Sequence, residues 1–486
     1  MTFGMAGEGR KSLAKIRDDA VFYPHQIDGI REMARMTSSL LADEMGLGKS
    51  IQALTVAAID FERGWASRVV VVCPASLKWN WLEEVEKHTR FTALVLDGTP
   101  KERALQLLDF EQTEIDILIV NYEQVAKHQV EINKLKFDIA FFDEAHYIKN
   151  RNAARTKSCH KVKVKRAFVL TGSPLLNQVN DLWGLLHRVD PARWPNYWRF
   201  VNRYAVFGGF KDKQIVGVKN RVELRTEVDD VMIRRLKKDV LDLPEKMNMT
   251  VVVDFHQTQE KYYKQAEEEL QIDLPSSPTP MQIENVLSKM LRLKQICGTP
   301  ATIGGEDDSY KLDRAVEMCE ELVHDEPDSP GEHLVVFTQF RGVLAAMQDR
   351  LDAAGIKSYT LHGDVDMKER QSVVADWTAS EPAVMLAMIQ VAGVGLTMTA
   401  AKTAIFLDKL WTPKLNEQAE DRLHRIGADK SRGSIDIYHI IVRNSIEQKI
   451  ERILRSKTKL FDTVIEESEW KRMLMESMDD EAEEDP

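Results

Sequence analysis

Short apolar runs alternate with amphipathic stretches in two separate parts of this 486-residue chain. The first part extends from residue 67 to about residue 186, and its apolar runs predict buried strands at 68–72, 115–120, 137–142 and 167–170. The second part predicts strands at 334–337, 358–361, 384–387, 403–407 and 435–439. Strands that alternate with helices form parallel sheets with helices on their faces. The pattern therefore predicts an α/β protein with two lobes.

The two lobes imply a division of the chain into four segments. We expect the first lobe at residues 1–186, the second lobe at 311–462 and an acidic tail at 463–486. Residues 187–310 contain a cluster of aromatic residues, then basic residues, then a stretch rich in Gln, Glu and Lys. This composition favours helical insertions on either side of an interlobe linker.

The composition and charge of the chain limit its expected location in the cell and its expected partners. It has no run of 18 apolar residues and no signal peptide, so we expect a cytoplasmic protein without membrane contact. Its four cysteines are scattered, which argues against structural zinc. The net charge of -11 disfavours a nucleic-acid partner slightly. Phosphate binding needs only a local basic stripe, however, so the charge does not exclude DNA.

A candidate phosphate-binding loop lies between residues 40 and 50. Its residues are Asp43, Glu44, Met45, Gly46, Leu47, Gly48, Lys49 and Ser50, and an apolar helical stretch follows. Backbone N–H groups at such a helix start bind phosphates, Lys49 would neutralise the terminal phosphates, and the Ser50 hydroxyl could hold Mg²⁺. Asp43 stands where the usual pattern has its first glycine. An ordinary glycine turn before a helix is the alternative interpretation.

Two acidic residues directly follow the predicted strand 137–142. Asp143 could coordinate Mg²⁺ through water, and Glu144 could accept a proton from an attacking water. Exposed acids that merely cap a strand are the alternative, but the position after a buried strand favours catalysis. Gln26, about 20 residues before the phosphate loop, offers a donor and an acceptor to the edge of adenine. A lone glutamine could equally be a surface residue.

Two arginines, Arg422 and Arg425, lie three residues apart on a stretch predicted to be helical, behind Gln418. Planar guanidinium groups stabilise charge on a transferring phosphoryl group, so we expect both to act on the phosphates held by Lys49. A solvated helix with an Asp421–Arg425 pair is the alternative. Nucleotide bound between the arginines and Lys49 would draw the lobes together, and hydrolysis would release them.

Three short loops are further candidates for function. Thr171-Gly-Ser173 follows a predicted strand and could sense the terminal phosphate of the nucleotide. Ser76 and Lys78 lie at another strand end, where they could contact DNA phosphates. The small residues of the loop 391–397 would allow backbone amides to approach DNA or nucleotide. For each loop, a plain turn or strand-to-helix connection is the alternative.

Taken together, these motifs resemble the Swi/Snf family of superfamily 2 helicase-like ATPases over nearly the whole chain. The strings that carry the resemblance are DEMGLGKS at 43–50, DEAHYIKN at 143–150, LTGSPLLN at 170–177, DLW at 181–183, IRRLKKDV at 233–240, LRLKQIC at 291–297, VFTQF at 336–340 and the stretch 418–427. Residues 151–154 and 418–422 further resemble the HepA-related, annealing-helicase branch. The resemblance implies two RecA-like lobes with helical protrusions, ATP and Mg²⁺ as cofactors, and tracking along duplex DNA without strand separation.

The resemblance also implies roles for individual residues. Catalysis falls to Lys49, Asp143, Glu144, Arg422 and Arg425. Nucleotide binding falls to Gln26, residues 43–50, Gly393 and Gly395, with Ser50 and Asp143 as the metal ligands. DNA binding falls to Ser76, Lys78, Thr397 and Trp411, and coupling to His146, Thr171, Ser173 and Gln418. Ala392, Thr412 and Ala428 replace residues typical of the family in loops concerned with DNA coupling.

We therefore expect a DNA-dependent ATPase that translocates on double-stranded or branched DNA and remodels DNA structures or displaces DNA-bound protein. A strand-separating helicase is one alternative, but no wedge element is evident. An ATP-gated DNA-binding scaffold is another, which an altered Lys49, Glu144 or Arg425 would have favoured. The sequence leaves no room for recognition domains, so a bacterial cell, or one infected by a virus, is the expected setting.

Overall fold

The structure is a computed structural model that describes residues 13–172, 179–208, 214–269, 271–272, 281–282, 286–324, 331–392, 396–411 and 413–451. The chain divides between Leu241 and Asp242 into two compact units. None of the helices within these described ranges is long and apolar enough to cross a membrane.

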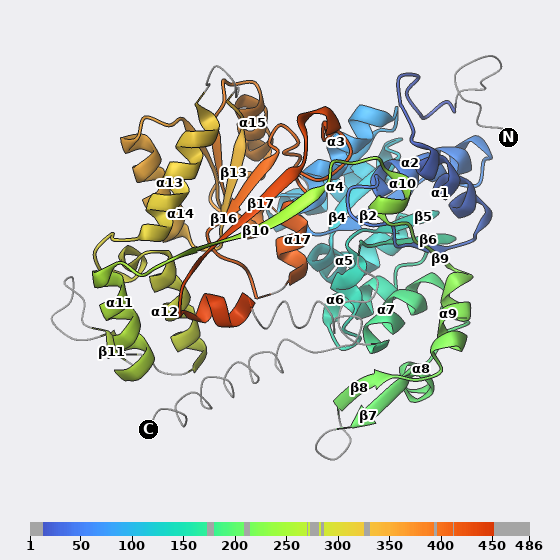
Figure 1. The fold of residues 1–486 in the computed structure, drawn as a ribbon. Coiled ribbons are helices and arrows are strands. Elements are labelled where there is room, and N and C mark those ends of the chain that lie inside the picture. Colours follow the sequence, from blue (N-terminus) through green and yellow to red (C-terminus); the bar gives the residue numbers. More distant parts are fainter. Residues whose placement is uncertain are drawn as a thin grey trace. The chain divides into compact units, whose positions relative to one another are not determined.

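The first unit is built on a seven-stranded sheet in the order β3-β4-β2-β5-β6-β1-β9 (Figure 1). Its strands are β1 (Ser39–Leu41), β2 (Val69–Cys73), β3 (Ala93–Val95), β4 (Ile117–Asn121), β5 (Ile139–Phe142), β6 (Arg166–Leu170) and β9 (Met232–Ile233). Neighbouring strands are parallel throughout. In β2, Val70 and Val72 belong to the hydrophobic cluster on one face, and Val69 and Val71 belong to the cluster on the other. A strand buried on both faces has no polar alternation, which explains its continuous valine run.

Helices connect these strands and cover the sheet. They are α1 (Pro24–Arg35), α2 (Lys49–Glu62), α3 (Lys78–His88), α4 (Pro100–Gln112), α5 (Tyr122–Lys134), α6 (Ala154–His160), α7 (Val179–Val189), α8 (Tyr197–Tyr204), α9 (Arg221–Asp229) and α10 (Lys237–Val240), with short 3-10 turns at Ala75–Leu77 and Ala145–Ile148. An antiparallel pair, β7 (Ala205–Gly208) and β8 (Gln214–Val218), lies between α8 and α9.

The second unit contains a six-stranded parallel sheet in the order β10-β17-β16-β13-β15-β14. Its strands are β10 (Lys246–Val253), β13 (Leu334–Thr338), β14 (Ser358–Leu361), β15 (Val384–Met388), β16 (Thr403–Phe406) and β17 (Ile435–Val442). Its helices are α11 (Gln257–Lys264), α12 (Val286–Gly298), α13 (Tyr310–Val323), α14 (Arg341–Ala353), α15 (Met367–Thr378), α16 (Ile389–Ala392) and α17 (Pro413–Glu420). A π-helical turn (Gln265–Glu269), the strand pair β11 (Gln271–Ile272) and β12 (Met281–Gln282), and 3-10 turns at Pro300–Ile303 and Lys430–Arg432 complete the unit.

The prediction of an α/β protein with two lobes, each a parallel sheet flanked by helices, is confirmed. The expected domain boundaries stay a prediction; residues 187–241 belong to the first unit and residues 242–310 to the second. In the described part of this middle region, short strands accompany the helices. β9 joins the first sheet beside β1. β10 joins the second sheet beside β17 (Figure 1). The two strands escape sequence recognition because β9 has two residues and β10, at a sheet edge, is only partly buried.

Candidate active site

The phosphate loop connects β1 to α2, and its two glycines have the backbone conformation that this connection requires. Gly46 has φ +83° and Gly48 has φ +74°, in the left-handed region that favours glycine. A Cβ at Gly48 would also collide with the side-chain amide of Gln26. Helix α2 begins at the next residue, Lys49. The loop therefore presents the free N–H groups of a helix start, which attract an anion.

The ammonium of Lys49 lies across the loop. Its Nζ donates to the main-chain oxygen of Asp43 at 2.9 Å and to that of Glu44 at 3.4 Å. The loop Thr171–Gly172 flanks the ammonium, because a Cβ at Gly172 would lie 3.6 Å from Nζ. Thr171 is buried, and its N–H donates to the carbonyl of Leu41 at 3.0 Å. Ser173, the other coupling candidate of this loop, lies outside the described residues.

The carboxylate of Asp43, where a glycine was expected, is turned toward two internal donors. Its Oδ2 accepts from Gln52 Nε2 at 3.1 Å and from Arg235 Nη1 at 3.2 Å, and the side chain is fully buried. Asp43 thus holds Lys49 through its main chain and anchors the loop through its side chain. The sequence did not identify Gln52 or Arg235 as partners, since Arg235 is almost 200 residues away.

Gln26 also contacts the phosphate loop. Its Nε2 donates to the carbonyl of Leu47 at 3.2 Å, and its Oε1 accepts from the Tyr23 N–H at 3.0 Å. His25 Nε2 lies 3.1 Å from the same Leu47 oxygen, and burial lowers the pKa of this histidine. The amide of Gln26 therefore binds the loop itself, and its contact with adenine stays a prediction.

Asp143 and Glu144 follow β5, the strand beside β6. Asp143 Oδ2 accepts from the indole Nε1 of Trp81 at 2.9 Å, and its main-chain oxygen accepts from the Tyr122 hydroxyl at 2.6 Å. Burial and the neighbouring Glu144 raise the pKa of Asp143 to about 6, whereas the Trp81 hydrogen bond and the charge of Lys49 lower it. The carboxylate is therefore mostly ionised at neutral pH and lies within electrostatic reach of Lys49.

Glu144 has an unusual backbone for a residue with a side chain. Its φ of +46° is left-handed, a conformation that costs a non-glycine residue energy and is concentrated at functional sites. Its carboxylate lies 3.2 Å from Nδ1 of His146, the predicted coupling residue. The strand end thus holds Asp143 inward on Trp81 and turns the backbone sharply at Glu144.

Trp81 and Tyr122 are site residues that sequence reasoning did not assign. Trp81 packs against Phe141 with ring centroids 6.4 Å apart. Its Nε1 also donates to the carboxylate of Asp143. The sequence places Trp81 shortly after β2, but a sequence pattern does not reveal the direction in which an indole N–H points.

The chemistry of the donors suits ATP with Mg²⁺ better than a metal held by protein alone. The described residues contain no cluster of three or more His, Cys, Asp or Glu side chains that could hold a metal. Mg²⁺ is usually bound by one or two carboxylates together with substrate phosphates. Asp143 after β5 and the hydroxyl of Ser50 in the first turn of α2 stay the predicted metal ligands.

The two arginines of the second unit do not lie on a helix, so that expectation was wrong. Helix α17 ends at Glu420, and Arg422 and Arg425 lie in the turns that follow, behind the half-buried Gln418. Arg422 is buried, and its main-chain oxygen accepts from the N–H of Met398 at 3.0 Å. Arg425 is half-buried.

Contacts with the segment around the start of β10 accompany the turn at these arginines. His424 Nε2 lies 2.9 Å from the carbonyl oxygen of Pro244, and Lys246 forms an ion pair with Glu420 at 2.6 Å. Both partners belong to the segment around the start of β10. Helix periodicity could not predict these contacts, because their partners lie more than 170 residues away in the sequence.

The predicted DNA-binding residues have different surroundings. Lys78 is buried, and its ammonium donates to the Leu96 carbonyl and to Asp97, both at 2.9 Å. This placement argues against a contact with DNA phosphate, because the ammonium is buried and already pairs with Asp97. Ser76 is half-buried in the 3-10 turn before α3, and Thr397 is exposed.

The last DNA-binding candidate, Trp411, is half-buried beneath a lysine. Lys294 Nζ lies 4.5 Å from the centre of its indole ring. Gly393 and Gly395, the candidate nucleotide-binding residues of the second unit, and Thr412 lie outside the described residues.

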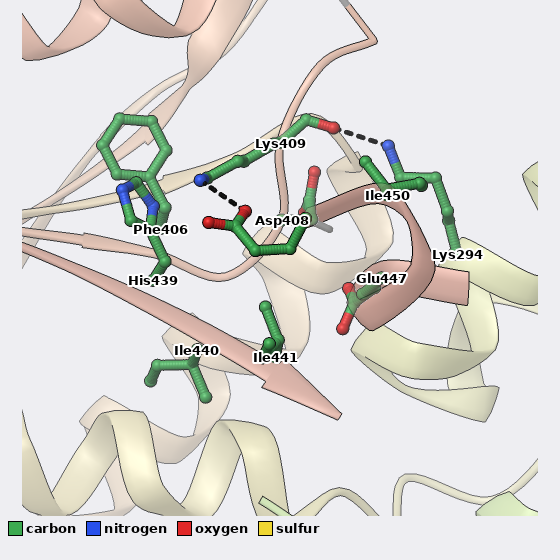
Figure 2. Close-up of a pocket in the computed structure, with 10 residues that line it drawn as sticks. Lys294, Phe406, Asp408, Lys409, His439, Ile440, Ile441, Glu447 and Ile450 are labelled. Carbon is green, nitrogen blue, oxygen red and sulfur yellow. Dashed lines mark hydrogen bonds and ion pairs between the residues drawn. The ribbon is translucent and has the colours of Figure 1, made fainter. Parts of the chain in front are cut away.

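Lys294 also lines a small charged pocket of the second unit. Figure 2 shows Lys294 directed at the main-chain oxygen of Lys409. The ammonium of Lys409 donates to the carboxylate of Glu451 at 2.9 Å. Burial lowers the pKa of Lys294 to about 8. Asp408, at the base of the loop, accepts from the Gln339 N–H at 3.0 Å. These contacts fix the loop that carries Trp411.

Comparisons with known proteins place this geometry among helicase-like ATPases. The SNF2-related domain family matches residues 25–302, and the helicase conserved C-terminal domain matches residues 314–427. An uncharacterized ATP-dependent helicase of Mycoplasma pneumoniae is 29% identical over 437 residues, which cover 88% of this chain and 40% of the relative. Chromodomain-helicase-DNA-binding protein 8 of Danio rerio is 27% identical over 467 residues, which cover 88% of this chain and 18% of the relative.

A solved structure is also similar. The Sulfolobus solfataricus SWI2/SNF2 ATPase core in complex with dsDNA is 26% identical, with a TM-score of 0.44, and the match covers 91% of this chain and 92% of that chain. The present chain spans less than half the length of the curated relatives described above.

Proposed function

This chain belongs to the Swi/Snf family of superfamily 2 helicase-like ATPases, and from that premise we propose that it uses ATP hydrolysis to translocate on double-stranded DNA. The observation that carries the proposal is the arrangement of the first unit, where Lys49 after β1 lies within electrostatic reach of Asp143 at the end of β5, with β6 between the two strands. In this proposal the chain remodels branched DNA or displaces DNA-bound protein.

ATP would bind with its phosphates at the start of α2. The helix N–H groups and Lys49 would neutralise phosphate charge in the ground state and in the transition state. Mg²⁺ held by Asp143 and Ser50 would offset the negative charge of the phosphates during transfer. Glu144 is proposed to orient the attacking water and accept its proton, which its half-buried carboxylate beside His146 suits.

The second unit is proposed to contribute Arg422 and Arg425. A guanidinium supplied to the transferring phosphoryl group can raise the rate by about 10³–10⁵. A turn fixed by Met398 and by the start of β10 would present the two side chains with little conformational freedom. Hydrolysis would then require both units, and ATP binding and product release would alternate between closed and open arrangements.

DNA is proposed to be held through its backbone, with Ser76, Thr397 and Trp411 as the remaining candidate contacts. Phosphate contacts position a protein on DNA without sequence information, so duplex of any sequence should serve. The relatives named above include a chromodomain-helicase-DNA-binding protein, which favours DNA as the partner. Membership in the HepA-related branch remains a prediction from residues 151–154 and 418–422.

One set of assays tests the proposal. ATP hydrolysis is measured without DNA and with single-stranded, duplex and forked DNA, and the displacement of a third strand from a triplex is measured in parallel. We expect strong stimulation by duplex, a steep decrease with salt because phosphate contacts release counterions, and ATP-dependent triplex displacement. Glu144→Gln, which should still bind ATP, is the control for dependence on hydrolysis.

The same assays distinguish the alternatives. Efficient ATP-dependent separation of a simple forked duplex, or stimulation by RNA alone, would identify a strand-separating helicase and overturn the proposal. Tight DNA binding that responds to ATP but shows no DNA-stimulated hydrolysis would identify the ATP-gated scaffold.

A further inference from the structure

Arg235, two residues after the short edge strand β9, contacts the first residue of the phosphate loop. Its Nη1 lies 3.2 Å from Oδ2 of Asp43, and its Nη2 lies 3.4 Å from Oε1 of Glu32 on α1. The guanidinium side chain is 13% exposed, whereas that of Asp43 is completely buried. Arg235 therefore links the loop to α1 from the side of β9.

The absence of a side chain at Gly29 leaves room for the contact between Arg235 and Asp43. A Cβ at Gly29 of α1 would collide with the Gln52 amide oxygen and would lie 2.6 Å from Nη1 of Arg235. Gln52 is the second donor to Asp43 Oδ2, at 3.1 Å. Three elements that are distant in sequence, α1, α2 and the segment after β9, thus converge on one carboxylate.

The main chain on either side of Arg235 is also bound to the loop. β1 pairs with β9, and the pairing continues past both strands, because the N–H of Glu44 donates to the Arg235 carbonyl at 2.9 Å. Beyond it, the N–H of Lys237 donates to the carboxylate of Glu44 at 2.7 Å. Residues 231–237 therefore follow the chain from Leu40 into the phosphate loop.

The buried carboxylate of Asp43 bears on the binding of nucleotide phosphates. Asp43 places a buried negative charge in the loop that is to receive the phosphates of ATP, and a buried carboxylate without a cation partner is strongly unfavourable. Arg235 supplies that cation. Without it, the carboxylate would repel the nucleotide phosphates or turn away and release the loop backbone that holds Lys49.

We propose that Arg235 is a positioning residue for the ATP-binding loop: through Asp43 and the Glu44 backbone it holds residues 43–49 in the conformation that accepts the phosphates. It lies six residues before the division at Leu241. The loop is thereby tied to the segment that leads into the second unit, and ATP binding orders that segment. The inference rests on the ATP site proposed above and does not depend on translocation along DNA.

The test compares ATP binding by Arg235→Met and by the adjacent Arg234→Met in the full chain, with a fluorescent ATP analogue and no DNA. Arg234 is exposed and serves as the matched control. We expect the dissociation constant to rise at least about tenfold for Arg235→Met, as for loss of a buried charge partner, and to stay within about twofold for Arg234→Met. Arg235→Lys keeps the charge but loses the two-pronged geometry, so it should bind with intermediate affinity.

A second substitution separates the electrostatic role from a general loss of structure. Asp43→Asn removes the charge that Arg235 neutralises, so Asp43→Asn combined with Arg235→Met should recover most of the lost ATP affinity. Hydrogen exchange of residues 231–241 should slow on ATP binding in the wild type and not in Arg235→Met. Unchanged affinity in Arg235→Met and Arg235→Lys, or a double variant as weak as Arg235→Met, overturns the inference. A wild type that does not bind ATP overturns the site assignment itself.

Discussion

Replacing Trp81 with phenylalanine removes one hydrogen bond from Asp143 and leaves an aromatic ring in the core. The indole Nε1 is 2.9 Å from Asp143 Oδ2, and Trp81 is buried against Phe141. The N–H stabilises the ionised carboxylate and lowers the pKa of Asp143, which burial raises to about 6, so loss of the N–H should raise this pKa further. The change therefore acts on the pH dependence of ATP hydrolysis.

The size of the effect follows from the energy of that bond. A hydrogen bond to a charged group contributes about 1.5–3 kcal/mol, and one pKa unit corresponds to about 1.4 kcal/mol, so the pKa should rise by about one to two units. A carboxyl group with a pKa of about 6 is about nine-tenths ionised at pH 7, and one with a pKa of about 7.5 is about one-quarter ionised. We expect kcat/KM to fall about fourfold at pH 7 and to recover toward pH 9.

The measurement is a profile of kcat/KM for ATP against pH, which reports ionisations of the free enzyme. Trp65→Phe is the matched control, because Trp65 is 56% exposed and stacks on Arg63 with a separation of 4.7 Å. Thermal unfolding of both variants verifies that the first unit is folded. An acidic limb that does not move in Trp81→Phe, or a loss of activity that is equal at pH 7 and pH 9, would refute the reasoning.

The remaining predictions concern the proposed phosphate and DNA contacts. Lys49→Ala should abolish ATP hydrolysis and weaken ATP binding, whereas Glu144→Gln should abolish hydrolysis and retain ATP affinity, because Glu144 acts on the attacking water. A hydrolysis rate within a few-fold of wild type in either variant would contradict the site assignment. Arg425→Ala should remove hydrolysis by the full chain while nucleotide titration shows nearly unchanged ATP affinity, and a large loss of affinity would count against a role in the transition state. Lys78→Met should lower the unfolding free energy by about 0.5–1.5 kcal/mol, since it removes the hydrogen bonds to the Leu96 carbonyl, which Gln124 still binds, and to the half-exposed Asp97. The salt dependence of DNA binding should stay the same in Lys78→Met, and a reduced slope would instead restore the phosphate contact.

Local sequence patterns were sufficient for the elements whose stability is decided by burial alone. The valine run of β2 and the apolar runs of β4, β5 and β6 could only be buried strands, and the order of strands and helices then required parallel sheets. The glycines at positions 46 and 48 marked the phosphate loop, because its turn needs positive φ. Asp143 and Glu144 were predicted as site residues because side chains at the ends of parallel strands face the edge of the sheet where ligands bind.

The sequence failed where a partner lies far away along the chain. Lys78 looked like a basic residue of a surface loop, but Asp97 and the Leu96 carbonyl draw it into the interior. The arginine stretch after α17 had helical spacing, yet contacts with the start of β10 accompany a turn there. Periodicity records which face of an element is apolar, and it contains no information about which distant group meets a polar side chain.

The chain of amino acids by itself therefore determined the two α/β lobes, the phosphate loop and the acidic pair that follows β5. Only the tertiary structure decided how these groups are held: Trp81 on Asp143, Arg235 on Asp43, and the strands β9 and β10 on either side of the division between the units. The physical reason is that burial is encoded locally, residue by residue. Hydrogen bonds and ion pairs are directional, and here they join residues that are far apart in the sequence. They therefore form only once the sheets have brought those residues together.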